Sequence, residues 1–112
     1  MVYGVTLISK ALEKNTFVTG LNLFKNNFDV DGCRALRELL KVNKNLEFLD
    51  IGHNRIRTKG LEEIGLGLKG AAHSKLQTLG LRMNFLNDES VSKFFDEIIL
   101  TGISKISKLF VS

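Results

Sequence analysis

The aliphatic residues of the chain recur at a spacing that neither simple strand alternation nor one helical face produces. In the stretch NLEFLDIGHN they are Leu46, Leu49 and Ile51, and the stretch ends at Asn54. The same spacing occurs in VTGLNLFKN, which ends at Asn26, and in LQTLGLRMN, which ends at Asn84. These Asn residues lie 28 and then 30 positions apart. Self-similarity at such a period predicts a stack of structural repeats.

The first part of each repeat predicts a short strand whose aliphatic side chains face the interior. The Asn follows where the chain leaves the strand. Its side-chain amide can hydrogen-bond to backbone groups in the bend, and such groups must be paired when they are buried. An apolar residue two positions after each Asn is expected to close the top of the core, and these residues are Phe28, Ile56 and Leu86.

The second part of each repeat predicts a helix, because apolar residues follow at the spacing of one helical face. These helices begin near Gly32, Gly60 and Ser90, and their predicted buried residues are Cys33, Leu36, Leu39 and Leu40; Leu61, Ile64 and Leu68; and Val91, Phe94, Phe95, Ile98 and Ile99. Gly4 stands in the same register. It predicts a helix of a preceding unit, with Val5, Ile8, Ala11 and Leu12 buried. The final ISKLFVS begins a fourth strand.

A strand, a crossover helix and a second strand give parallel pairing with the helices on one face. The unit resembles the leucine-rich repeats of the ribonuclease-inhibitor type, and NKNLEFLDIGHNRI followed by KGLEEI carries the resemblance best. The resemblance spans residues 4–111. It implies an α/β solenoid with a parallel sheet on the concave face and helices on the convex face. We expect one domain over residues 1–112, with about four units of which the first and last are partial.

The predicted fourth strand has no turn or helix after it, and an exposed strand edge invites pairing with another chain. Three interpretations stay open. The chain is a fragment of a longer array, it forms a homodimer through this C-terminal edge, or it is a short protein that tolerates the exposed edge.

The family resemblance implies that a partner protein binds along the concave face. Aromatic residues and Arg are enriched where interfaces gain most of their binding energy. The predicted partner-binding residues are Phe24, Lys25, Phe48, Asp50, Arg82 and Phe110. Three glycines on the same face, Gly20, Gly52 and Gly80, are expected to leave room for the partner. The alternative is that the exposed Phe side chains only cover one another.

The predicted function is therefore a protein–protein interaction module. Two alternatives remain: a regulatory domain resembling small-GTPase activators, and a structural, self-assembling segment of a cytoskeletal protein. Both imply protein partners, and the resemblance does not decide among them because one fold hosts many functions.

Composition excludes several other classes. The 112 residues are 44% hydrophobic and 25% charged, which is ordinary for a folded domain. No apolar run reaches the roughly 18 residues of a membrane span, and the N-terminus lacks a secretory leader, so we expect a cytoplasmic protein without a membrane partner. The net charge of +4 is small. Arg34, Arg37, Lys41 and Lys44 share one predicted helix face, but no Arg-rich run predicts specific nucleic-acid binding.

Two further sequence patterns do not predict a metal site or a nucleotide-binding site. His53, His73 and Cys33 fall in separate repeats or links without zinc-ligand spacing, and Cys33 is predicted to be a buried thiol. The GLGLKG stretch matches G-x-G-x-x-G, but it lies at the end of a predicted helix, whereas a nucleotide-binding loop follows a strand. We therefore expect no catalytic residue, no metal, no cofactor and no enzymatic activity.

Overall fold

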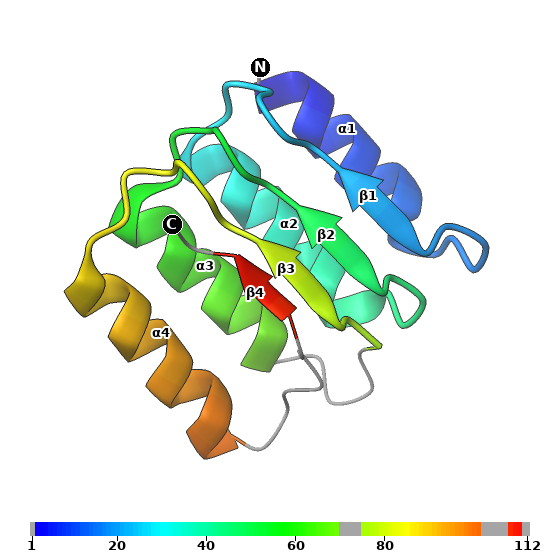
Figure 1. Cartoon of the computed structure of the whole chain (residues 1–112). Coiled ribbons are helices and arrows are strands. Elements are labelled where there is room, and N and C mark those ends of the chain that lie inside the picture. The colour runs from blue at the N-terminus through cyan, green and yellow to red at the C-terminus, as the bar shows by residue number, and fades with distance from the viewer. Residues whose placement is uncertain (1, 70–74, 102–107, 111–112) are drawn as a thin grey trace.

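The computed structural model describes residues 2–69, 75–101 and 108–110. Helices and strands alternate along these ranges (Figure 1). The elements are α1 (Val2–Leu12), β1 (Gly20–Asn22), α2 (Val30–Val42), β2 (Phe48–Asp50), α3 (Arg57–Lys69), β3 (Thr78–Gly80), α4 (Asp88–Thr101) and β4 (Lys108–Phe110).

The strands form one parallel sheet in the order β1-β2-β3-β4. Gly20 pairs with Phe48, Phe48 with Thr78, and Thr78 with Lys108, which is the register that the sequence repeat predicts. The helices lie side by side in a second layer, and none of the described helices lies on the opposite face of the sheet (Figure 1). The predicted α/β architecture is confirmed.

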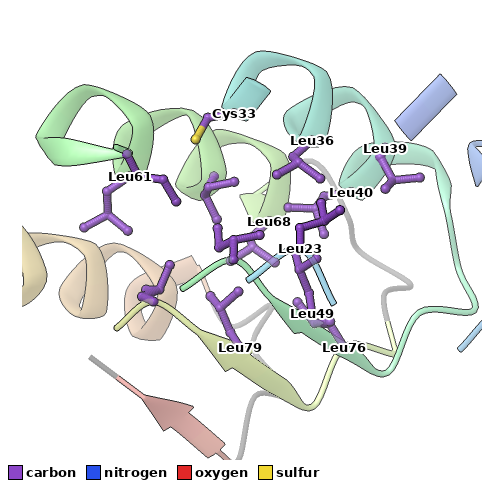
Figure 2. Close-up of a cluster of buried hydrophobic side chains, with 14 of the residues drawn as sticks. Leu23, Cys33, Leu36, Leu39, Leu40, Leu49, Leu61, Leu68, Leu76 and Leu79 are labelled. Atoms are coloured by element: carbon purple, nitrogen blue, oxygen red, sulfur yellow. The ribbon is translucent and has the colours of Figure 1, made fainter. Parts of the chain in front are cut away.

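A hydrophobic core fills the space between the two layers (Figure 2). The inward strand residues of the two central repeats are fully or almost fully buried: Leu46, Leu49, Ile51, Leu76, Leu79 and Leu81. The apolar residues that were predicted to be buried in α2 and α3 are also fully or almost fully buried, and the same holds for Phe28 and Ile56. Each large side chain buried in this way contributes about 1.5–3 kcal/mol relative to exposure.

The prediction was wrong for parts of the two outer helices. In α1, Val5 and Ser9 are buried, but Ile8 is 41% exposed and Ala11 is exposed. Among the described helices α1 has only α2 as a neighbour, so only a narrow stripe of the helix is covered. In α4, Phe94 is buried whereas Phe95 is 40% exposed, because Phe95 lies about 100° further around the helix and α4 has only α3 as a neighbouring helix among the described elements. The side chains of Ile98 and Ile99 lie outside the described residues.

Two buried Asn side chains join neighbouring repeats at the carboxyl ends of the strands. Asn54 accepts a hydrogen bond from the Asn26 amide at 2.8 Å and donates to the Leu23 carbonyl at 3.1 Å, both in the preceding repeat. Asn84 repeats this arrangement one unit on, accepting from the Asn54 amide at 3.0 Å and donating to the Ile51 carbonyl at 2.9 Å. Each also bonds to a carbonyl of its own turn.

A second Asn position, which the sequence reasoning missed, fixes the opposite ends of the strands. The side-chain Nδ2 of Asn43 donates to the Leu12 carbonyl at 2.7 Å, and the side-chain Oδ1 of Asn43 accepts from the Leu46 backbone amide at 2.9 Å. Asn15 occupies the same place in the first repeat, where its oxygen accepts from the Val18 amide at 2.7 Å. In the sequence, this position can be recognised as an Asn that lies three residues before the first aliphatic residue of the strand, as Asn15 does before Val18 and Asn43 before Leu46.

The glycines of GLGLKG that the structure describes lie inside α3, as predicted. A Cβ atom placed at Gly67 would lie 3.0 Å from the Cα and carbonyl oxygen of Arg37 in α2, so glycine allows the two helices to approach closely. A Cβ atom at Gly65 would meet the ring of Phe94 at an ordinary 3.6 Å.

Replacing Asn54 by Ala should destabilise the fold by about 3 kcal/mol, because buried backbone groups of two repeats lose their partner. Asn26→Ala is the matched control. Asn26 is exposed and donates to the Phe24 carbonyl within its own turn, so we expect a loss below about 1 kcal/mol. Urea denaturation measures both variants, and equal losses would contradict the role assigned to Asn54.

Gly67→Ala and Gly65→Ala should change stability in opposite directions. The Gly67 variant forces α3 away from α2 and should cost about 1–3 kcal/mol. The Gly65 variant gains helix propensity without a clash and should stabilise by up to about 1 kcal/mol. Thermal unfolding of the two variants tests this difference, and two destabilised proteins would show that the α3–α4 contact is tighter than described.

Candidate partner-binding surface

The sheet face without helices, which we call the open face, displays several of the predicted binding residues. Phe48 projects from β2 and is 38% exposed, and Phe24 follows β1 and is 42% exposed. Asp50 is half-buried at the end of β2, and Arg82 is exposed just after β3. Phe110 pairs with Gly80 in the sheet register, but its side chain lies outside the described residues.

Two of the three glycines of the open face, Gly52 and Gly80, do not leave the room that was expected for a partner. A Cβ atom at Gly52 would lie 2.9 Å from the Phe24 ring, and one at Gly80 would lie 2.6 Å from the Asp50 carboxylate. A Cβ atom at Gly20 would lie 3.9 Å from the nearest side-chain atoms of Phe48, which is ordinary van der Waals contact. At Gly52 and Gly80 the protein fills this space itself, because a side chain of one repeat lies over a glycine of the next.

Three of the predicted residues gather around one shallow hollow. Phe24, Asp50 and Arg82, together with Gly80, line a space of about 170 Å³. The Asp50 carboxylate accepts a hydrogen bond from the Gly52 amide at 2.9 Å, which holds it in place. The hollow thus combines an aromatic ring with one acidic and one basic group, a set that suits a polar protein surface.

Lys25 belongs to a different and larger hollow, which lies along the carboxyl ends of the strands. We call this surface the rim. It encloses about 680 Å³ and is lined by Lys25, Asn27, His53, Asn54, Arg55, Met83 and Phe85. The ring of His53 lies 5.6 Å from that of Phe24, so the rim adjoins the open face. The sequence reasoning missed Arg55 and Phe85, which each follow a repeat Asn directly.

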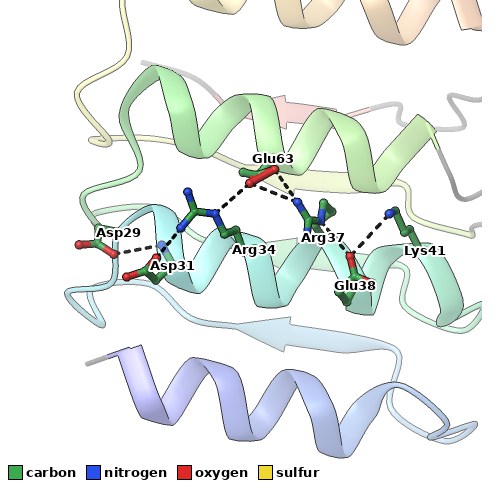
Figure 3. Close-up of polar contacts among 7 residues, drawn as sticks. All are labelled: Asp29, Asp31, Arg34, Arg37, Glu38, Lys41 and Glu63. Atoms are coloured by element: carbon green, nitrogen blue, oxygen red, sulfur yellow. Dashed lines mark hydrogen bonds and ion pairs between the residues drawn. The ribbon is translucent and has the colours of Figure 1, made fainter.

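Three cations of the predicted basic helix face, Arg34, Arg37 and Lys41, are paired with carboxylates within the helical layer (Figure 3). The fourth, Lys44, lies beyond the end of α2. Arg34 and Arg37 of α2 both bond to Glu63 of α3, at 3.2 and 2.9 Å. Arg37 also bonds to Glu38 at 2.8 Å, and this hydrogen bond lowers the pKa of the Glu38 carboxyl. Lys41 lies 3.5 Å from the same carboxylate. This face therefore presents paired charges instead of a row of cations.

Cys33 is buried, as predicted. Burial raises the pKa of its thiol to about 12, so the thiol stays protonated at neutral pH and is a poor nucleophile. Among the described residues, His, Cys, Asp and Glu side chains form no group of three that could hold a metal ion. His73 lies outside the described residues. In the same part of the chain, every helix is too short or too polar to cross a membrane.

The strand–turn–helix unit, stacked in register on one parallel sheet, defines a solenoid protein. A family model described as a leucine-rich repeat matches residues 14–36 and 42–65. The chain is also 34% identical over 79 residues to the human NACHT, LRR and PYD domains-containing protein 13. That segment is 70% of this chain and 7% of the human protein's length. The chain is a leucine-rich-repeat protein.

Two solved structures share the fold. Leiomodin-1 Actin-Binding Site 2 superposes with a TM-score of 0.84 at 20% identity, over 100% of this chain and 64% of that one. The tropomodulin C-terminal domain of Caenorhabditis elegans gives a TM-score of 0.72 at 18% identity, over 96% of this chain and 62% of that one. This chain thus spans less than two thirds of either structure, and at such identities the likeness shows the fold alone.

Proposed function

We propose that this chain is a protein-binding module whose partner lies on the open face of the sheet. The observation that carries the proposal is the grouping of Phe24, Asp50 and Arg82 around one hollow, with Phe48 exposed on the adjoining strand surface. Lys25 and Phe110 extend the proposed contact surface toward the rim and β4. Aromatic residues and Arg supply much of the binding energy in protein interfaces.

The rigidity of this surface supports the same proposal. Phe24 rests over Gly52, and the Asp50 carboxylate is held by the Gly52 amide. Side chains that are already fixed lose little conformational freedom on binding, which favours affinity. Single exposed apolar residues are common on any protein, so the test must compare Phe48 with an equally exposed Phe elsewhere.

Phe48→Asp should abolish or strongly reduce capture of the partner, because it places a charge at the centre of the proposed interface. Phe95→Asp is the matched control, since Phe95 is 40% exposed on α4, in the opposite layer. Each variant would be checked by circular dichroism and used in pull-downs from cell lysate read by mass spectrometry. A protein lost only with Phe48→Asp supports the open face, whereas a protein lost only with Phe95→Asp places the interface on the helices.

Actin is a second, more specific candidate for the partner, and the likeness to an actin-binding site of leiomodin-1 favours it. This candidate belongs with the interpretation of the chain as a segment of a cytoskeletal protein. The GTPase-regulating alternative stays an untested prediction.

We expect the chain to bind actin saturably in co-sedimentation with filaments or in a fluorescence titration of monomers. Phe48→Asp should weaken this binding by about tenfold or more, as expected for loss of an anchor residue, whereas Phe95→Asp should not. Absence of binding to both forms of actin would reject this partner, and the lysate experiment would then decide the broader proposal.

A further inference from the structure

The rim is larger than the hollow of the open face, and the proposed open-face function uses only Lys25 of its lining. It forms where the loops after β1, β2 and β3 lie side by side (Figure 1). Its volume of about 680 Å³ falls within the roughly 300–1,000 Å³ of clefts that hold ligands.

The charge on this surface has one sign. Lys25 and Arg55 line the rim and are exposed, Arg57 is exposed beside it, and no carboxylate of the described ranges forms an ion pair with any of these three residues. The carboxylate of Asp29 faces the start of α2, where it accepts a hydrogen bond from the Asp31 amide. The rim therefore differs from the outer helix face, where Glu63 joins two arginines, and it suits an anionic ligand.

Arg57 is an unexpected residue for its position. It occupies the place in its repeat that Asp29 and Asn87 hold in theirs, and those two side chains accept hydrogen bonds from the first turns of α2 and α4. A guanidinium has no acceptor, and its positive charge is unfavourable at a helix N-terminus. Arg57 also has a left-handed φ of 59°. Helix stability therefore does not account for an arginine at this position.

Apolar side chains lie beside these cations. Met83 is 60% exposed and Phe85 is 69% exposed, and both have left-handed φ values, 57° and 60°. Bulky residues rarely adopt that conformation. The core does not require them, because Leu86 is the residue of this turn that packs against it. The Arg57 guanidinium lies over the Phe85 ring, 5.6 Å from its centroid, so charge and apolar surface form one continuous site.

We propose that the rim binds a short acidic peptide segment that carries an aromatic or aliphatic side chain. Carboxylates of the segment pair with Lys25, Arg55 and Arg57, and its apolar side chain lies against Met83 and Phe85. An acidic protein segment fits better than a nucleic acid, because the cations occupy one compact hollow with an apolar wall instead of a long basic track.

The test measures binding of labelled short peptides by fluorescence anisotropy. One set contains Asp and Glu interspersed with Phe and Leu. A second set replaces the acids by Asn and Gln, and a third replaces Phe and Leu by Ser and Gly. The first set should bind, and each of the other two sets should bind at least about tenfold more weakly than the first. Equal binding of the first and third sets, or failure of all three, would overturn the proposal.

Variants then locate the peptide site. Lys25→Glu with Arg55→Glu should abolish binding of the first peptide set. Lys14→Glu with Lys44→Glu makes the same change of charge in exposed loops that lead into β1 and β2, at the other end of the strands, and should leave binding intact. Equal loss in both double variants would show a general charge effect and would overturn the site.

Two single variants separate the rim from the fold and from the open face. Phe85→Asn should weaken the peptide complex without lowering the melting temperature, because Asn tolerates a left-handed φ better than Phe. Phe48→Asp should leave peptide binding unchanged, so the rim and the open face can fail independently. A DNA or RNA oligonucleotide that competes with the peptide more strongly than unlabelled peptide would overturn the choice of ligand.

Discussion

Hydrogen bonds of buried Asn side chains at the strand exits hold the repeats together. Where a short parallel strand ends, its carbonyls lose their partners while they are still buried, and such groups must be satisfied. Asn54 and Asn84 meet this need by bonding to their own turn and to the turn before it. Neither side chain could make all of its bonds within a single repeat. The stack is therefore cooperative: each turn is complete only when its neighbour is in place.

The hydrogen bonds of these Asn side chains also determine which residues come together on the two candidate surfaces, the open face and the rim. Because the hydrogen bonds of Asn54 and Asn84 hold the turns in register, equivalent positions of successive repeats form rows across the sheet. On the open face, this register brings Phe24 over Gly52 and Asp50 over Gly80. At the rim, it brings Lys25, His53 and Met83 into one row, each with a left-handed φ between 54° and 59°. The same backbone geometry thus supports different side-chain chemistry in each repeat.

The sequence predicted most of the fold and only part of the site. Periodicity identifies which residues face inward, and the burial of Leu46, Leu49 and Ile51 follows from it. It does not show what a neighbouring repeat places against a given residue. For that reason Gly52 and Gly80 were taken as open space, and the ion pairs of Arg34 and Arg37 with Glu63 on the next helix were not foreseen. Lys25, His53 and Met83 were expected at this edge of the sheet, but the hollow itself and its residues Arg55 and Phe85 were missed, because the hollow depends on the lateral spacing of loops from three repeats.

The chemistry of the rim changes from one side to the other. A parallel sheet places the carboxyl ends of all its strands on one edge, so the repeats contribute to the rim in chain order. One row runs Lys25, His53, Met83 and the next runs Asn27, Arg55, Phe85, which takes the surface from polar and cationic near β1 to apolar near β3. A bound segment would therefore have a preferred direction, with carboxylates for Lys25 and Arg55 toward β1, and its apolar residue toward β3, where Arg57 lies over the Phe85 ring and pairs with one further carboxylate. The open face beside it carries both charge signs and has no such gradient, so the two surfaces would select different parts of a partner.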